Sequence, residues 1–221
     1  MKIQLHLHVQ GDPIDNIKYT PKQAIDKAYK LNYKVISFTC HDKLIYNQSL
    51  AEYAKSKGIL LIPGIEKTIQ KKHVLIINAT KDSEKIQTFT DLELYKNNNP
   101  ECLIIAAHPF HPSSTSLMLK LIKHIDLFDA IEHSYFCSTL INPNILSKLV
   151  SKIYKKPLIA TGDIHYLDGF DYGYVKLNKK TKLETKHIFD NLKKQNFINE
   201  SKKFSSIDLF KLLYKLNKAT K

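Results

Sequence analysis

Arginine is absent from this sequence, and all 34 of its basic residues are lysine. Arginine is the side chain best suited to bind phosphate through two parallel hydrogen bonds, so its absence argues against a dedicated nucleic-acid-reading surface. The formal net charge of +13 would still draw polyanions to the surface without selectivity. Because lysine, asparagine and isoleucine are abundant along the whole chain, the charge indicates a compositional bias rather than one functional patch.

Cysteine and long hydrophobic runs are also scarce. The three cysteines, Cys40, Cys102 and Cys137, are odd in number and form no C-x-x-C pair, which argues against a disulfide framework and against a thiolate zinc site. No apolar run approaches the length of a membrane span, and the first residues, MKIQLHLH, interrupt the apolar core that a signal peptide needs. We therefore expect a cytoplasmic protein without a membrane anchor.

Apolar runs alternate with amphipathic stretches along the chain. Strands are expected over residues 2–8, 34–39, 59–63, 73–79, 103–107, 128–132, 158–161 and 174–177. Helices are expected from Thr20-Pro21 onward and over residues 50–57, 83–95, 117–123, 144–154, 186–194 and 207–218. This alternation predicts a parallel sheet covered by helices, closed or nearly closed into a barrel, in one domain over residues 1–221. Residues 178–221 would add helices that pack on the barrel.

The stretch LHLHVQGD near the amino terminus carries the first candidate site. In a strand, His6 and His8 point to one face, while Leu5 and Leu7 point to the other. Asp12 follows in the next loop. An H-x-H pair alone is short enough to arise by chance, so its meaning depends on whether other strands end in matching ligands.

Other predicted strands do end in such residues. The positions at or beside strand ends are His6, His8, Asp12, His41, Glu66, His73, His108, His133, Asp163 and His165. In a barrel, the carboxyl ends of the strands form the active site. Imidazole and carboxylate without thiolate suit Zn, Mn or Fe, and the number of ligands implies two or three divalent ions, with Glu66 able to bridge two of them. Such a cluster would turn a bound water into a hydroxide nucleophile and hold an anionic phosphate ester.

The ordered motifs HLH, CH, GIE, KH, AHP and GDIH resemble the PHP family, the polymerase and histidinol phosphatase domain, over residues 1–177. The resemblance implies a distorted (β/α)7 barrel that binds up to three metal ions and hydrolyses phosphoesters. By this resemblance, His6, His8, Glu66 and Asp163 would hold the first metal. Glu66, His73 and His108 would hold the second, and Asp12, His41 and His165 the third.

Three departures from the family pattern all affect the third metal or its surroundings. Val9 stands where the family usually has Thr or Ser after the second histidine. Asp12 comes one residue early and precedes Pro13, which leaves Asp15 as the alternative ligand. Cys40 occupies the position before His41, where the family commonly has an acid.

These residues predict a metal-dependent phosphoesterase in which Glu66, Asp163, His165 and His133 are the candidate catalytic residues, with His133 facing the substrate. The expected substrate is a small phosphorylated molecule, a nucleotide or a short nucleic acid, and no obligate protein partner is evident. One alternative is an amidohydrolase-type metal hydrolase, which would require a lysine that bridges the metals. The other is a non-catalytic PHP-like module that binds nucleic acid or a partner, which the positive charge keeps open.

Overall fold

The computed structural model describes residues 1–137, 142–202, 204–205 and 207–209. Its strands are β1 (Lys2–Gln4), β2 (Tyr33–Phe38), β3 (Leu60–Ile69), β4 (Lys72–Ile77), β5 (Leu103–Ala106), β6 (Ala130–Ser134), β7 (Leu158–Thr161), β8 (Gly173–Leu177) and β9 (Phe197–Ser201). Its α-helices are α1 (Pro21–Lys30), α2 (Gln48–Ser56), α3 (Phe89–Asn98), α4 (Leu119–Lys123), α5 (Asn144–Ile153) and α6 (Thr185–Lys193). Short 3-10 turns are η1 (Lys81–Lys85), η2 (Ile125–Leu127) and η3 (Leu167–Gly169).

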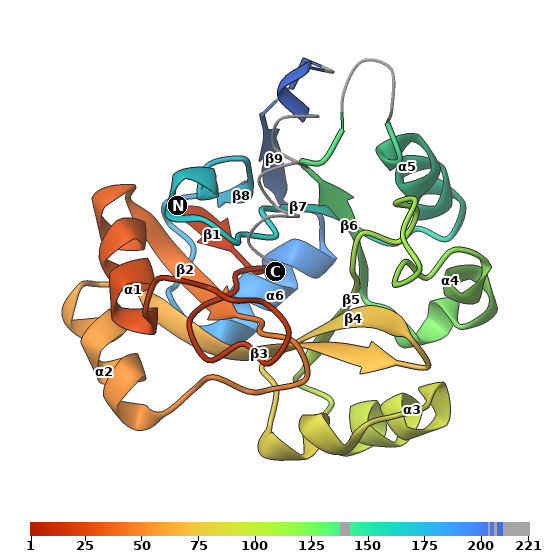
Figure 1. The fold of residues 1–221 in the computed structure, drawn as a ribbon, viewed down its shortest axis with the longest axis horizontal. Helices are drawn as coiled ribbons and strands as arrows, with labels where there is room; N and C mark the ends of the chain where they lie inside the picture. The colour runs from red at the N-terminus through yellow and green to blue at the C-terminus, as the bar shows by residue number, and fades with distance from the viewer. Residues whose placement is uncertain (138–141, 203, 206, 210–221) are drawn as a thin grey trace.

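The strands form one curved sheet in the order β7-β6-β5-β4-β3-β2-β1-β8-β9. Figure 1 shows the strands around the centre of the molecule, with α1 to α5 outside them. The predicted α/β barrel is confirmed, but the prediction of a wholly parallel sheet is wrong. The pairs β3–β4, β4–β5, β1–β8 and β8–β9 are antiparallel, and the remaining pairs are parallel.

A tight hairpin between β3 and β4 explains the first antiparallel pair. Ile69 pairs with Lys72, so only Gln70 and Lys71 form the turn, and both have positive φ angles of 47° and 66°. Two such residues are typical of a type I′ hairpin, which usually contains Asn or Gly. The Gln70-Lys71 pair contains neither Asn nor Gly, so the sequence carries no sign of a hairpin. The sequence pattern therefore predicts that the strands expected over residues 59–63 and 73–79 are separate members of a parallel sheet.

One side chain closes the seam between the two ends of the sheet. The amide of Asn199 on β9 accepts a hydrogen bond from the backbone N–H of Ala160 (2.8 Å) and donates one to the carbonyl of Leu158 (2.7 Å), both on β7. The side chain thus makes the contacts that a neighbouring strand would make, and the sheet becomes a nearly closed barrel. Strand β9 itself was not predicted, because only helices were expected in residues 178–221.

The lower part of the barrel is filled by aliphatic side chains from every strand from β1 to β8. These are Ile3, Val35, Ile62, Leu75, Ile77, Leu103, Ile105, Ala130, Ile159, Val175 and Leu177, all buried. Helix α6 packs Ile188, Phe189 and Leu192 into the same cluster and so covers this end of the barrel. The opposite end, where most strands finish, is left for polar groups.

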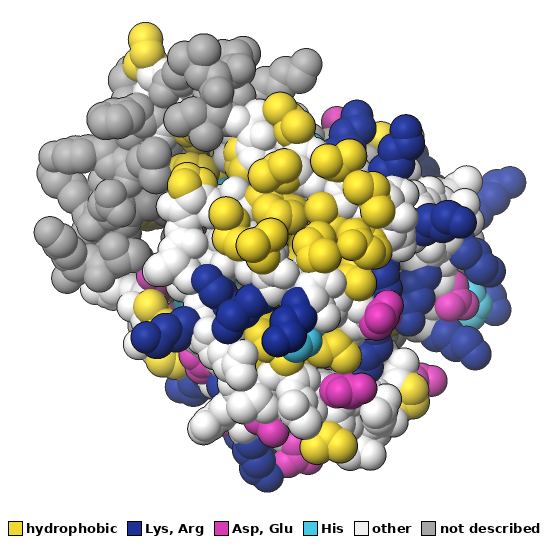
Figure 2. All heavy atoms as spheres, turned by 90° about the vertical axis from the view of Figure 1, so that its right-hand side faces the viewer, with side chains coloured by type: hydrophobic (Ala, Val, Ile, Leu, Met, Phe, Trp, Pro, Cys, Tyr) yellow, Lys and Arg dark blue, Asp and Glu magenta, His cyan; other side chains and the backbone are white. Residues whose placement is uncertain are grey.

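Two further apolar layers attach the outer helices to the sheet. Helices α1 and α2 pack on the outer faces of β2 and β3 through residues such as Ala24, Ile36 and Leu61. Helices α3 to α5 pack on β4 to β6 through residues such as Leu92, Leu121 and Ile131. The outward side of α4 and α5 carries exposed hydrophobic side chains, which are visible in Figure 2.

The first strand is shorter than expected, and its alternation breaks after Gln4. Leu5 and Leu7, which were expected to share one apolar face, are both buried but lie in different clusters: Leu7 packs with residues of α1, and Leu5 packs with Ile3 in the barrel interior. The two leucines do not share one layer, because the regular strand ends at Gln4.

At the other end of the chain, the helix predicted over residues 207–218 lies outside the described residues from position 210 onward. Within the described part of the chain, no helix has the length and apolar character that crossing a bilayer would need.

Candidate metal centre

His6 and His8 follow β1 and point toward the upper end of the barrel. Their rings are fully buried, and their centroids lie 5.3 Å apart. The Nε2 atom of His6 lies 3.3 Å from Oε2 of Glu66 and 3.2 Å from Oδ1 of Asp163. For His8 the same two distances are 3.4 and 3.3 Å. The four side chains therefore converge on one point from β1, β3 and the turn after β7.

These separations fit a metal ion better than they fit hydrogen bonds. A tetrahedral zinc ion with bonds of about 2.0–2.1 Å holds its ligand atoms about 3.3–3.4 Å from one another. The Nε2 atoms of His6 and His8 are buried and have no hydrogen-bond partner among the described residues. A buried imidazole nitrogen without a partner is costly, and a metal ion would satisfy both nitrogens at once.

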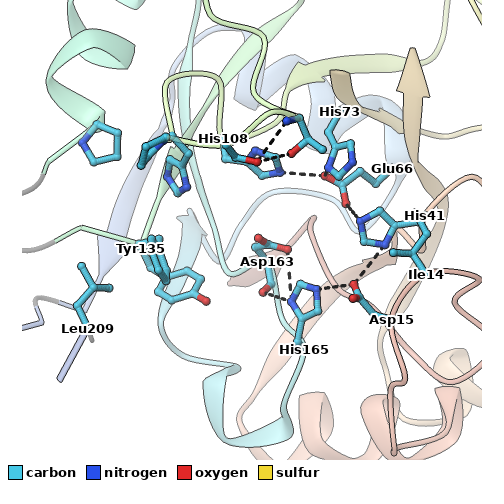
Figure 3. Close-up of a pocket in the computed structure, with 16 residues that line it drawn as sticks. Ile14, Asp15, His41, Glu66, His73, His108, Tyr135, Asp163, His165 and Leu209 are labelled. Carbon is cyan, nitrogen blue, oxygen red and sulfur yellow. Dashed lines mark hydrogen bonds and ion pairs between the residues drawn. The ribbon is translucent and has the colours of Figure 1, made fainter. Parts of the chain in front are cut away.

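Glu66, at the end of the barrel-lining part of β3, divides its two carboxylate oxygens between two groups of histidines. Oε2 faces His6, His8 and His41, the last at 3.1 Å. Oε1 lies 2.9 Å from Nδ1 of His73 and 3.1 Å from Nε2 of His108. Figure 3 shows Glu66 between His41 and His73, with His108 beyond. The side chain is 1% exposed, and each of its oxygens faces a different group of histidines.

The two acids of the first loop have different positions. Oδ2 of Asp12 lies 2.8 Å from Nδ1 of His8 and accepts a hydrogen bond from the backbone N–H of His41 (2.9 Å). Its Oδ1 accepts hydrogen bonds from the backbone of Ile14 and Asp15. Asp12 is thus held behind the histidines and does not line the cavity described below.

Asp15 is the first-loop acid that faces the cavity. Its Oδ2 atom lies 2.9 Å from Nε2 of His165 and 3.4 Å from Nδ1 of His41. The family resemblance gave this place to Asp12, with Asp15 as the alternative; ligand atoms of both acids lie within reach of His8 and His41, and Asp15 is the one of the two that lines the cavity. The short loop with Pro13 turns the earlier acid inward, and only three residues later does a carboxylate reach the cavity.

Sequence reasoning missed Glu132, which lies directly beneath the site. This residue on β6 is 1% exposed. Its Oε1 accepts hydrogen bonds from Nδ1 of His6 (2.7 Å) and from the hydroxyl of Thr161, and its Oε2 accepts one from the backbone N–H of His108. A carboxylate on Nδ1 fixes the tautomer of His6 and leaves Nε2 free to bind a metal. The sequence did contain a signal for Glu132: it is a single acidic residue in a strand expected to be buried, and a buried carboxylate must find a hydrogen-bond partner.

His133, by contrast, is not among the residues that line the cavity. Successive residues of a strand point to opposite faces, and Glu132 occupies the inner face of β6. His133 therefore lies on the outer face, with Ile131, which packs against the outer helices. A contact between His133 and the substrate stays a prediction, and the register of β6, which continues to Ser134, places Glu132 rather than His133 on the inner face.

Charge balance within the site calls for positive charge at its centre. Burial alone would lower the pKa of His6, but the carboxylates of Asp163, Glu66 and Glu132 raise it well above its ordinary value. Burial alone would raise the pKa of Glu66, but His73 and His6 hold it well below its ordinary value. The carboxylates are therefore ionised, and either protons on the imidazoles or divalent cations must compensate them.

A cavity of about 530 Å³ opens above these residues, and its two halves differ in chemistry. One half is lined by the candidate ligands Asp15, His41, Glu66, His73, His108, Asp163 and His165. The other half is lined mainly by apolar and aromatic groups, namely His111, Pro112, Tyr135, Phe136, Pro143 and Leu209, whereas Ile14 lies beside His41 and Asp15. Figure 3 shows Tyr135 and Leu209 across the cavity from the ligands. None of the described lining residues is a lysine.

Three of the wall residues have distinct properties. Burial lowers the pKa of His111 to about 4, so its ring is neutral at physiological pH. Its ring lies 5.6 Å from that of Phe136 and forms part of the same wall. Tyr135 is buried, and its hydroxyl makes no hydrogen bond within the described chain. The wall thus offers the rings of His111, Tyr135 and Phe136 to a bound molecule, together with a Tyr135 hydroxyl that has no partner among the described residues.

Neither a family model nor a curated protein matches this sequence. Solved structures do. A two-domain protein from Bacteroides vulgatus that contains a predicted PHP-like metal-dependent phosphoesterase is 18% identical with a TM-score of 0.71, over 98% of this chain and 69% of that chain. PsfC from Pseudomonas syringae is 12% identical with a TM-score of 0.64, over 99% of this chain and 97% of that chain.

A third similar structure is the lesion-specific endonuclease Q from Pyrococcus furiosus. It is 14% identical with a TM-score of 0.60, over 90% of this chain and 57% of that chain. At such identities the likeness concerns the fold. The chain therefore has the fold of the PHP-like metal-dependent phosphoesterases, as its ordered motifs predicted.

Proposed function

We propose that this protein is a metal-dependent hydrolase that cleaves phosphoester bonds at a centre of two or three divalent ions. The observation that carries the proposal is the bridging position of Glu66, whose two oxygens face two separate groups of histidines. His6, His8, Glu66 and Asp163 would hold one ion, and Glu66, His73 and His108 a second. Asp15, His41 and His165 are the candidates for a third, with Asp12 as the further acid beside His8 and His41.

Ions bound here would supply a water of lowered pKa as the nucleophile and would neutralise the phosphate oxygens. The chain's own residues hold the ligands in place. Glu132 holds His6 and Asp12 holds His8, each by accepting a hydrogen bond from Nδ1–H, which leaves Nε2 directed at the centre. We propose Glu66, Asp163 and His165 as the residues nearest the reaction. Because His133 faces away, the hydroxyl of Tyr135 is the better candidate for a hydrogen bond to the substrate.

The substrate would bind with its phosphate at the metal half and its alcohol portion at the apolar wall. No described lining residue is a lysine, so the metal centre itself would have to neutralise the phosphate. A cavity of about 530 Å³ lies in the usual range for small ligands. These features favour a small phosphomonoester or a nucleotide. A short nucleic acid would have to enter by its end.

Two other functions are less well supported. An amidohydrolase-type centre would require a lysine that bridges the metals, and Glu66 stands at the bridging point instead. A non-catalytic module that binds nucleic acid would have no need of a ligand set whose nitrogens remain buried and unpaired. The lysine-rich surface is the observation that favours the non-catalytic module.

Elemental analysis combined with a hydrolysis assay tests the proposal. The purified protein is expected to bind two or three equivalents of Zn, Mn or Fe and to hydrolyse phosphomonoesters when these metals are restored after chelation. Glu66→Gln should lower both metal content and turnover, whereas Glu93→Gln, an exposed residue of α3, should change neither. Less than one bound ion per chain, together with no metal-stimulated hydrolysis of any phosphoester, would falsify the proposal.

A further inference from the structure

Helix α5 has the reverse of the usual amphipathic arrangement. The residues that it buries against the barrel are Asn144, Ser147 and Val150, of which two are polar. Its large aliphatic residues face outward: Ile145 is 65% exposed and Ile153 is 61% exposed, with Leu146 and Leu149 beside them. A surface helix normally turns its apolar stripe toward the core. The outward stripe therefore calls for a second surface to cover it.

The exposed face extends from α5 onto the start of α4. Met118 and Leu119 are also exposed, Leu119 by 83%. Figure 2 shows hydrophobic side chains gathered over this side of the molecule, with lysines at the edges of the patch. The six residues of this apolar face are Met118, Leu119, Ile145, Leu146, Leu149 and Ile153. Their exposed fractions of 45–83% correspond to on the order of 700 Å² of residue surface per chain, which is comparable with the largest patches on typical monomers, about 300–600 Å².

We propose that a second copy of this chain docks on the apolar face through a two-fold axis that passes near Leu149. Ile145, Leu149 and Ile153 are spaced by four residues, so they form one row along the helix with Leu149 at its centre. In an antiparallel pair of α5 helices, Leu149 meets its own copy and Ile145 meets Ile153 of the other copy. Such a row is self-complementary, as a two-fold interface requires.

The area of the apolar face agrees with a stable dimer. Each partner in a standard interface buries about 800 Å², close to the estimate of about 700 Å² for this face. The buried side of α5 gives the helix a firm base. The side chain of Asn144 accepts a hydrogen bond from the backbone N–H of Ser134 (2.9 Å) and donates one to its carbonyl (2.7 Å). Docking would therefore join two rigid surfaces and would order little additional chain.

Charges at the border of the apolar face give this dimer a distinctive salt dependence. Lys148 and Lys152, one residue before Leu149 and Ile153, run along one flank of the stripe. The two-fold axis brings these flanks of the two copies to the same side, where like charges repel. Salt screens this repulsion and strengthens hydrophobic burial, so association should increase with salt concentration. An acidic helix or an anionic membrane bound to the same lysines would show the opposite dependence.

Sedimentation equilibrium of the full chain over a range of protein and salt concentrations tests the proposal. The wild type is expected to form dimers that strengthen as salt rises. Leu149→Glu should weaken the dimer at least tenfold, because it places two carboxylates at the axis. Leu94→Glu is the matched control, since Leu94 is a helical leucine of similar exposure (58% against 52%) that belongs to α3 and not to the apolar face. Circular dichroism would establish that both variants fold.

Disulfide trapping provides a second measurement that depends on the symmetry. In a Cys137→Ser background, which removes the one cysteine that is not buried, Leu149→Cys should form a disulfide with its own copy. Leu94→Cys should not. A monomer at all salt concentrations, or a dimer that Leu149→Glu leaves intact, would overturn the proposal. Binding of the apolar face to anionic vesicles or to an acidic peptide, without self-association, would also overturn it.

Discussion

The buried carboxylate of Glu132 offers the sharpest test of how the barrel controls its metal centre. Glu132 accepts hydrogen bonds from His6 Nδ1 and the Thr161 hydroxyl on one oxygen and from the backbone N–H of His108 on the other. Glutamine has the same shape but only one acceptor oxygen. If the amide NH₂ of this glutamine faces the backbone N–H of His108, two hydrogen-bond donors point at each other and neither has an acceptor. If it faces His6, the imidazole must accept at Nδ1 and carry its proton on Nε2, where a metal would bind.

Either orientation of the amide has a cost that can be estimated. A buried donor without an acceptor costs about 1–3 kcal/mol. Loss of a carboxylate that orients a ligating histidine typically lowers metal affinity about 10- to 100-fold, which corresponds to about 1.4–2.7 kcal/mol. For a domain of this size, about 2 kcal/mol lowers the melting temperature by about 4–8 °C. Glu132→Gln is therefore expected to fold, with weaker metal binding and a lower melting temperature.

The assay is a titration of the chelated protein with Zn or Mn, followed by calorimetry or by competition with a chromophoric chelator. Asp129→Asn is the control. Its carboxylate accepts hydrogen bonds from the backbone N–H of Ile104 (2.8 Å) and from Lys96 (3.0 Å), away from the site. The control should lower stability and leave metal affinity unchanged. If Glu132→Gln also binds metal with wild-type affinity, Glu132 supports the fold only, and the argument for tautomer control is wrong.

Three further predictions concern the loop, the histidines and the cavity wall. Asp15→Asn should reduce the number of bound metal ions measured by elemental analysis. Asp12→Asn should weaken metal binding but leave the number of bound ions unchanged at saturating metal. The reverse pattern would show that Asp12 is the ligand. Without metal, the pKa values of His6 and His8 are raised in the folded protein, so their protonation adds stability that is fully present below about pH 6.5 and is lost as the pH rises through the folded-state pKa values. Calorimetry of the chelated protein should therefore show a melting temperature that falls above neutral pH. A melting temperature that does not change with pH would contradict this. Phe136→Ala should lower kcat/KM about 2- to 10-fold for phenyl phosphate and leave glycerol phosphate unchanged, and an equal loss for both would remove the wall from substrate recognition.

Local patterns in the sequence were sufficient to predict the barrel and the assembly of its ligands. The alternation of apolar runs and helices located β2, β5 and β7 within a residue or two. Histidines at strand ends were expected to converge, because the carboxyl ends of neighbouring barrel strands meet at one rim. His6, His41, Glu66, His108 and Asp163 do lie together there, although each arrives on a different strand or the loop after it.

The features that could not be predicted depend on register and on turn conformation. Whether His133 or Glu132 faces inward changes with a shift of one residue, since a strand has a period of two. The choice between Asp12 and Asp15 depends on the path of a short loop, which no residue pattern specifies. The antiparallel β4 follows from a hairpin at Gln70 and Lys71, two residues that adopt positive φ angles without the usual Asn or Gly.

Between the apolar floor of the barrel and the metal ligands lies a layer of buried polar groups, and its hydrogen bonds explain how the ligands keep their positions. Oε1 of Gln4 accepts hydrogen bonds from the backbone of His6 (3.2 Å) and Gly162 (2.9 Å), and its Nε2 donates to the carbonyl of Gly173 (2.8 Å). One side chain therefore joins the segments that carry His6 and Asp163. A Cβ atom at position 162 would lie 2.5 Å from Nε2 of Gln4 and 2.2 Å from Cδ1 of Ile164, so a larger residue there would have to displace the side chain of Gln4 from its hydrogen bonds and move Ile164. A preorganised centre needs this layer, since an aliphatic core alone could not orient an imidazole to within the tolerance of a metal ion.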